Sequence, residues 1–222
     1  LGLVPPGLVP VERNSFEGPA NTGPSLCPEE CMRAVIRDLV AGMAPGDAAE
    51  VADLRFALEW VDSGAPLWRE GGPAEPPIHL VAYFVPIDVA TREMLLVDHR
   101  RAGMWLPPGG HVEVGETPAD TVRREAAEEL GIEVTVEPPP PALLTVTATV
   151  GTGPRHTDVS LWYPLPMPRT TRIAADEGEF AAARWFAWDA LPGARRGPDI
   201  DRFLERLERF TEAGRRTTAT RE

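Results

Sequence analysis

Three glutamates stand at the spacing that places side chains on one face of a helix. Glu125, Glu128 and Glu129 occupy positions i, i+3 and i+4, which are neighbours on the surface of an α-helix. Like charges at this spacing repel one another and destabilise an isolated helix. A bound cation would offset that repulsion, and hard oxygen ligands suit Mg²⁺ or Mn²⁺. The sequence therefore predicts a metal site on one face of a short helix.

Signals that begin and end a helix flank these glutamates. Thr117 is a hydroxyl N-cap, Pro118 takes the first helical position, and Asp120 stands three residues after the cap. Gly131 ends the helix, because the left-handed residue after a helix is tolerated best without a Cβ. We therefore expect one helix between these signals, preceded by a loop that carries Glu116.

The run from residue 110 to residue 132 resembles the Nudix box, the pattern G-x5-E-x7-R-E-U-x-E-E-x-G-U in which U is aliphatic. Its fixed and aliphatic positions are filled by Gly110, Glu116, Arg124, Glu125, Ala126, Glu128, Glu129, Gly131 and Ile132. Average composition makes a random match over so many positions very rare. The alternative is an amphipathic surface helix with solvated acids, which would leave the leading glycine and Glu116 as coincidences.

The resemblance implies a role for each matching residue. The expected metal ligands are Glu125, Glu128 and Glu129, with the backbone carbonyl of Gly110. Glu116 lies one loop away from Arg124 and is close enough to accept its hydrogen bonds, so we expect this pair to hold the loop against the helix. The alternative for Arg124 is a solvated helix arginine.

Many Nudix enzymes take a general base or a further metal ligand from a later loop. The acidic turn at 176–179 stands at the corresponding place, and it makes Glu177 and Glu179 candidates. The alternative is a solvated acidic turn. The resemblance leaves open which of the two carboxylates acts.

Four further residues are candidates for substrate binding. Arg100 and Arg101 form the basic pair nearest to the box, where they would face the leaving group. His156 begins a strand and would contact a phosphate or a base. Trp105 either stacks on a base or fills the core, and the core is favoured because tryptophan is highly buried on average. His111 lies at a variable box position, where surface packing is favoured over a substrate contact.

Composition narrows the class of protein. A chain of 222 residues with 43% hydrophobic content can bury one core with an extension. The net charge of −12 argues against a nucleic-acid polymer as partner, since such binding depends on a basic footprint. Cys27 and Cys31 are too close for an easy disulfide and lack the partners of a zinc site. No apolar run approaches the ~20 residues that span a membrane, and no signal pattern begins the chain, so we expect a cytoplasmic protein without a membrane partner.

The pattern of elements predicts the fold class and three segments. Residues 1–27 form a flexible Pro/Gly-rich arm, 28–70 a helical extension, and 71–222 the Nudix domain. Expected helices lie at 28–42, 47–62 and 199–213, besides the box helix, and expected strands at 78–85, 94–98, 133–136, 143–150, 158–165 and 184–188. This order suits an α/β fold, an α/β/α sandwich around a mixed β-sheet, which is also the fold that the resemblance implies. The helical extension could shape the substrate pocket or contact a second copy in a homodimer.

The resemblance also implies a reaction. We expect Mg²⁺-dependent or Mn²⁺-dependent hydrolysis of a phosphoanhydride bond in a nucleoside diphosphate linked to another moiety. A nucleoside triphosphate or an oxidised nucleotide, as in the MutT-like group, is the first substrate expected, and ADP-ribose or a sugar nucleotide is the nearest competitor. A non-hydrolytic Nudix-like sensor that binds a nucleotide is the rival from another class. Such sensors usually lose a box carboxylate, and this chain retains all of them.

Overall fold

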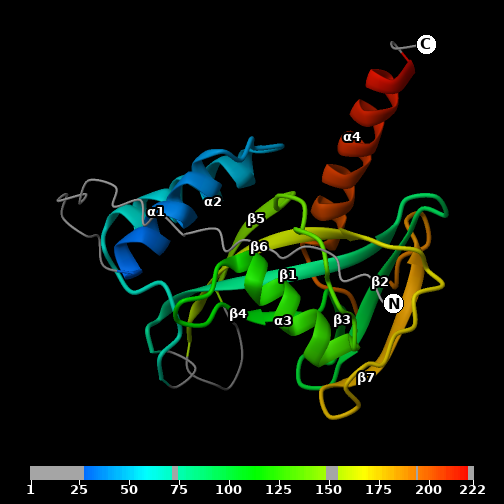
Figure 1. Ribbon diagram of the computed structural model, residues 1–222, viewed down its shortest axis with the longest axis horizontal. Helices are drawn as coiled ribbons and strands as arrows, with labels where there is room; N and C mark the ends of the chain where they lie inside the picture. The colour runs from blue at the N-terminus through cyan, green and yellow to red at the C-terminus, as the bar shows by residue number, and fades with distance from the viewer. Residues whose placement is uncertain (1–27, 72–74, 149–154, 194, 220–222) are drawn as a thin grey trace, which may run out of the picture.

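A computed structural model describes residues 28–71, 75–148, 155–193 and 195–219, with side chains described up to residue 209. The predicted arm at 1–27 lies outside the described residues. The helices are α1 (Pro28–Ala41), α2 (Ala48–Asp62), α3 (Pro118–Leu130) and α4 (Ile200–Ala219). The strands are β1 (Ile78–Asp88), β2 (Glu93–His99), β3 (Met104–Leu106), β4 (Gly109–His111), β5 (Leu143–Ala148), β6 (Thr157–Pro166) and β7 (Phe180–Ala187), as Figure 1 shows.

The strands form one mixed sheet of seven, with β1 at its centre. The main path runs β3-β2-β1-β6-β5, while β4 pairs with β1 and β7 pairs with β2. Strand β1 is parallel to β6 and antiparallel to β2 and β4. Its register sets His79 opposite Asp158 in β6 and Val81 opposite His111 in β4. Because directly paired residues face the same side of a sheet, this register brings side chains from three strands together.

Alternation along β1 separates a core face from a second face. Leu80, Ala82 and Phe84 are fully buried and belong to the core cluster that also contains α2 and α3 residues. A second core cluster joins β1 and β6 residues to Phe203 and Leu207 of α4. Helices thus cover both faces of the sheet, and the predicted α/β/α sandwich is confirmed.

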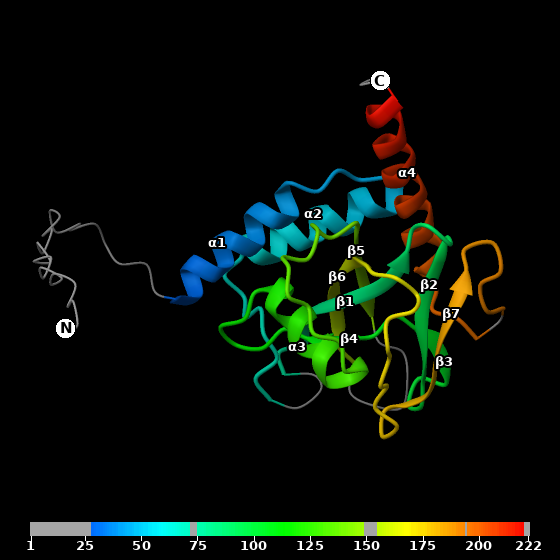
Figure 2. The same ribbon diagram turned by 45° about the vertical axis from the view of Figure 1, so that its right-hand side comes forward.

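The two N-terminal helices pack together against one end of the sheet, as Figure 2 shows. Asp47 caps α2 by accepting a hydrogen bond of 2.7 Å from the Glu50 amide. Trp60 and Leu67 are buried in the same core cluster as the sheet residues. The Leu80 amide of β1 also donates to the Leu67 carbonyl at 2.9 Å. The helical extension therefore shares a core with the sheet.

The predicted strand at 133–136 is wrong. This segment lies outside every strand of the described chain, and Val136 is 71% exposed. Its β-branched residues imitate a strand, but it lies between the helix stop and the prolines at 138–141, and a strand needs a partner as well as propensity. Strands β3 and β4 went unpredicted because three residues, two of them glycine in β4, carry no period. Residues 149–150 of the predicted strand at 143–150 lie outside the described residues.

Candidate metal and nucleotide site

The helix that carries the box begins and ends as predicted. Thr117 accepts a hydrogen bond from the Asp120 amide, and the Asp120 carboxylate accepts one of 3.1 Å from the Thr117 amide. Pro118 occupies the first turn, and Gly131 is left-handed with φ of 64°. Both ends of α3 are therefore fixed by local chemistry, which determines where its glutamates point.

Arg124 links the box loop to the helix. Its guanidinium donates to both carboxylate oxygens of Glu116, at 2.8 and 3.1 Å, and to the His111 carbonyl at 3.1 Å. It also donates to Glu125 at 2.7 Å and to Glu128 at 3.3 Å. The hydrogen bond with Glu116 is the main reason why the pKa of Arg124 is raised. The predicted contact between Arg124 and Glu116 is present, and this arginine is committed to protein groups.

Two glycines allow the segment that forms β4 to pass tightly between β1 and α3. Gly109 has φ of 136°, and a Cβ there would meet the Ala82 carbonyl oxygen. At Gly110 a Cβ would overlap the Glu125 carboxylate. The Gly109 amide donates to the Glu129 carboxylate at 2.7 Å. Backbone groups of this loop therefore lie directly beside the carboxylates of α3.

Glu125, Glu128 and Glu129, here called the glutamate face, differ in burial. Glu129 is buried and Glu128 is exposed. Burial, then the charge of Glu125, raises the pKa of Glu129 to about 9. Burial likewise raises the pKa of Glu125. Two carboxyls that resist ionisation side by side would be stabilised as carboxylates by a divalent cation, so the donor set fits Mg²⁺.

The glutamate face does not form a closed set of ligands. Among the described residues, the group whose ligand atoms lie within 4.8 Å of one another consists of three histidines and Asp158 and includes none of these glutamates. Arg124 accounts for this, because it draws Glu125 and Glu128 toward its own guanidinium. A bound cation would replace some of the hydrogen bonds that Arg124 donates to Glu125 and Glu128. The predicted ligand set, including Gly110, stays a prediction.

A cleft of about 560 Å³ opens beside these carboxylates. Glu125 and Glu129 form one wall, and Glu179 and Arg101 from two other loops also line it. Glu179 contributes to the raised pKa of both glutamates. Its carboxylate lies 3.6 Å from His99 Nε2. The volume lies within the range of about 300–1,000 Å³ that is usual for small-molecule sites.

The structure places the other predicted residues elsewhere. Glu177 is exposed, and its carbonyl accepts a hydrogen bond of 3.0 Å from Arg100 Nε, so neither side chain is among those that line the cleft. Trp105 packs edge-on against Phe186, with ring centroids 4.9 Å apart, within the second core cluster. The core alternative therefore describes Trp105. His156 lies immediately before β6, beside other histidines.

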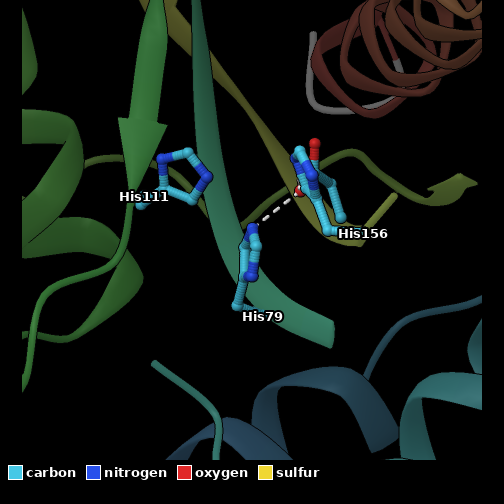
Figure 3. Close-up of side chains that lie close together, drawn as sticks. His79, His111 and His156 are labelled. Carbon is cyan, nitrogen blue, oxygen red and sulfur yellow. Dashed lines mark ion pairs between the residues drawn. The ribbon is translucent and has the colours of Figure 1, made fainter. Parts of the chain in front are cut away.

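His79, His111, His156 and Asp158, here called the histidine cluster, meet at one end of the cleft. Figure 3 shows the three imidazole rings turned toward one another. The ring centroids of His79 lie 4.7 Å from those of His111 and 5.0 Å from those of His156. His111 and Asp158 line the cleft, while His79 is fully buried. Burial, then the nearby His79, lowers the pKa of His111 to about 4, which keeps its ring neutral.

Sequence reasoning missed most of this cluster. Its members come from three separate stretches of chain, at residue 79, residue 111 and residues 156–158, and no regular spacing joins these stretches. The one available signal was a histidine inside an otherwise apolar strand at His79, because a polar residue buried in a strand requires partners. The expectation that the His111 side chain packs on the surface is wrong, because the pairing of β4 with β1 places its ring 4.7 Å from that of His79.

Comparison with known proteins places this site in a family. Residues 77–207 match the family model of the NUDIX domain. The fold, the box and this match together define the class of protein. The chain belongs to the Nudix hydrolase family.

Two curated relatives and a solved structure illustrate the similarity. Over 121 residues the chain is 35% identical to the NAD-capped RNA hydrolase NudC of Vibrio vulnificus (strain CMCP6), which covers 52% of this chain and 42% of that protein. Over 73 residues it is 41% identical to nucleoside diphosphate-linked moiety X motif 6 of Mus musculus, covering 30% and 23%. The chain thus spans less than half the length of these relatives. The MutT protein of Methanosarcina mazei Go1 covers 62% of this chain and 97% of its own, with 22% identity and a TM-score of 0.49.

None of the described helices is both long enough and apolar enough to cross a lipid bilayer.

Proposed function

We propose that this chain hydrolyses a phosphoanhydride bond in a nucleoside diphosphate linked to another moiety, with Mg²⁺ or Mn²⁺ as cofactor. A nucleoside triphosphate or an oxidised nucleotide is the first substrate proposed, and ADP-ribose or a sugar nucleotide is the second. The observation that carries the proposal is that the half-buried Glu125 and the buried Glu129 stand together in a cleft that Glu179 also lines. Three carboxylates at a substrate-sized cleft suit a cation and a phosphate chain better than an uncharged ligand.

Each protein group has a defined task in this proposal. A bound divalent cation would neutralise phosphate charge and lower the pKa of a water molecule. Glu125, Glu128 and Glu129 would hold it, and the Gly109 amide fixes the direction of the Glu129 carboxylate. Glu179 would accept the proton of the attacking water from the opposite loop. Arg101, whose side chain lines the cleft, would face the leaving phosphate.

Arg124 and Glu116 act as positioning residues in this scheme. Their paired hydrogen bonds hold the loop that carries Gly110 against α3. The net charge of −12 supports a small anionic nucleotide as partner over a polymer, because few basic groups face the cleft. We also propose that residues 71–222 form the catalytic domain and that 28–70 complete its core, since Trp60 and Leu67 pack with the sheet.

A substrate panel tests the proposal. The full chain is incubated with nucleoside triphosphates, oxidised nucleotides, ADP-ribose and sugar nucleotides, with Mg²⁺ or with chelator, and products are identified by phosphorus NMR. We expect a nucleoside monophosphate or a similar product to be released with Mg²⁺ and not with chelator. Glu133→Gln, at an exposed glutamate just beyond α3, serves as the matched control for box variants. Tight nucleotide binding without turnover would instead identify a sensor and contradict the proposal.

A further inference from the structure

The histidine cluster combines features that a structural hydrogen-bond network lacks. His79 Nε2 lies 3.0 Å from Asp158 Oδ1, and His156 Nε2 lies 3.5 Å from the same oxygen. Nevertheless His79 Nε2, His111 Nε2 and Asp158 Oδ1 are buried and form no hydrogen bond within the described part of the chain. Buried polar atoms are normally paired. Close atoms that do not point along hydrogen bonds resemble ligands that surround a common centre.

The tautomer of His79 supports this interpretation. Its Nδ1 lies 3.1 Å from the Pro76 carbonyl oxygen. A carbonyl can only accept, so Nδ1 carries the proton, and the Nε2 of a neutral ring presents a lone pair. In the neutral ring, that lone pair would face the carboxylate oxygen of Asp158 at 3.0 Å, which also presents lone pairs. A cation between them converts this repulsion into attraction, and a backbone carbonyl behind the ring is the usual support of a metal-binding histidine.

The sheet itself places three of the four side chains. His79 and Asp158 are directly paired between β1 and β6, and His111 is paired with Val81, two residues after His79. Residues two apart in a strand face the same side, so these rings and the carboxylate project from one face. His156 precedes Asp158 by two residues and joins them. The cluster is therefore built on adjacent strands of a rigid sheet.

We propose that His79, His111, His156 and Asp158 bind a first-row transition-metal ion of the Zn²⁺ type, separate from the magnesium site of the glutamate face. One donor atom from each residue lies within 4.8 Å of all the others. Ligands of a tetrahedral zinc ion stand about 3.3 Å apart, given ligand distances of about 2.0–2.1 Å. Imidazole donors favour zinc, copper, iron or nickel, whereas Mg²⁺ favours oxygen. The proposal stands independently of the hydrolysis proposed above.

One contact must change when the ion binds. Arg69 Nη1 lies 3.3 Å from His111 Nδ1. Arginine only donates, so this contact requires a lone pair on Nδ1 and a proton on Nε2. Metal binding through Nε2 moves the proton to Nδ1, and the exposed Arg69 side chain then turns away. His111 and Asp158 line the cleft, so the bound ion would stand at its end.

Spectroscopy on the full chain tests the proposal without an activity assay. Protein stripped with chelator is titrated with Co²⁺ in excess Mg²⁺, which occupies the glutamate face. We expect one Co²⁺ per chain with the strong visible absorption of tetrahedral coordination, displaced by Zn²⁺ and not by further Mg²⁺. His156→Ala and Asp158→Asn should each weaken binding by at least about 100-fold, because even the loss of an outer-shell partner costs about 10–100-fold. His99→Ala and Glu129→Gln should leave it unchanged.

Nitrogen NMR of the imidazoles provides a second measurement that needs no variant. The chain contains four histidines, so His99 is an internal control. Zn²⁺ should shift the ring resonances of His79, His111 and His156 and leave those of His99 in place. Absence of any Co²⁺ or Zn²⁺ binding in excess Mg²⁺, a shift confined to His99, or loss of binding in Glu129→Gln but not in His156→Ala would overturn the proposal.

Discussion

The glutamate face and the histidine cluster border the same cleft and differ in what already satisfies them. Arg124 contacts Glu125 and Glu128, and the Gly109 amide contacts Glu129. In the histidine cluster, three buried atoms that could bind a metal ion form no hydrogen bond to described residues. The first arrangement suits a hydrated hard ion that exchanges with protein partners, and the second suits an ion that gives up its water. Two groups of side chains with different chemistry therefore border one cleft.

The largest effect should come from Glu129→Gln. It removes a ligand charge from the glutamate face, and we expect hydrolysis at saturating Mg²⁺ to fall by about 10²-fold or more, since a metal supplies several kcal/mol of charge stabilisation. Initial rates on the best substrate of the panel measure this, with Glu133→Gln as control. Full activity in Glu129→Gln would contradict a catalytic role for the glutamate face, and with it the functional difference between this face and the histidine cluster.

Gly109→Ala should strongly destabilise the loop between the two sites. The φ of 136° and the overlap of a Cβ with the Ala82 carbonyl predict a loss of about 3 kcal/mol or more in the free energy of unfolding. Gly115→Ala is the matched control, because its φ is 86° but its Cβ would meet nothing within 4 Å, so we expect about 1 kcal/mol. Denaturant unfolding measures both. Equal losses would mean that close packing against β1 contributes little.

A double-mutant cycle tests whether Arg124 and Glu116 serve the glutamate face as one unit. Each substitution by alanine removes the same paired hydrogen bonds, so the loss in kcat/KM for the double variant should fall short of the sum by about 0.5–3 kcal/mol. Glu116→Ala should leave Co²⁺ binding at the histidine cluster unchanged, because the Glu116 carboxylate bonds to Arg124, Thr121 and the Glu113 amide. Fully additive losses would show that the two side chains act separately.

Arg69→Ala should increase the affinity of the histidine cluster for Zn²⁺. It removes the donor that competes for His111, and a hydrogen bond of about 0.5–1.5 kcal/mol corresponds to a gain of roughly 2- to 10-fold in Zn²⁺ affinity. Competition between Zn²⁺ and Co²⁺ measures it. A weaker affinity would mean that Arg69 supports the cluster.

The smallest effect concerns the capping box of α3. The hydrogen bond from the Thr117 hydroxyl is the main cause that lowers the pKa of Asp120 from its ordinary value of 3.8. Because the folded pKa is below the unfolded one, this stabilisation is present above about pH 4 and is lost as pH falls through the folded pKa. Asp120→Asn should cost about 0.5–1 kcal/mol at neutral pH and remove that pH dependence. Urea unfolding at pH 7 and pH 3 measures both effects. If the free energy of unfolding falls between these two pH values as much in Asp120→Asn as in the parent protein, another group causes the acid sensitivity.

Local chemistry explains how much the sequence could predict. The caps of α3, the acid spacing and the contact between Glu116 and Arg124 depend on residues near one another in the chain, so their pattern is visible in it. The sequence could not distinguish Glu177 from Glu179 in the acidic turn. Only in the folded loop does Glu179 line the cleft while Glu177 is exposed to solvent. The histidine cluster depends on the pairing of β1 with β4 and β6. The buried His79 was a local signal that partners exist, but no local pattern shows which strands lie beside β1.

The alternation of β1 has a consequence for tolerance to change. One side of the strand fills the core with Leu80, Ala82 and Phe84, while His79 and Val81 on the other side belong to the histidine cluster and the cleft wall. A single inserted residue would exchange these two sides. It would place a histidine in the core and aliphatic side chains in the cleft at once. We therefore expect a single inserted residue to be tolerated better in the turn at 89–92 than within β1.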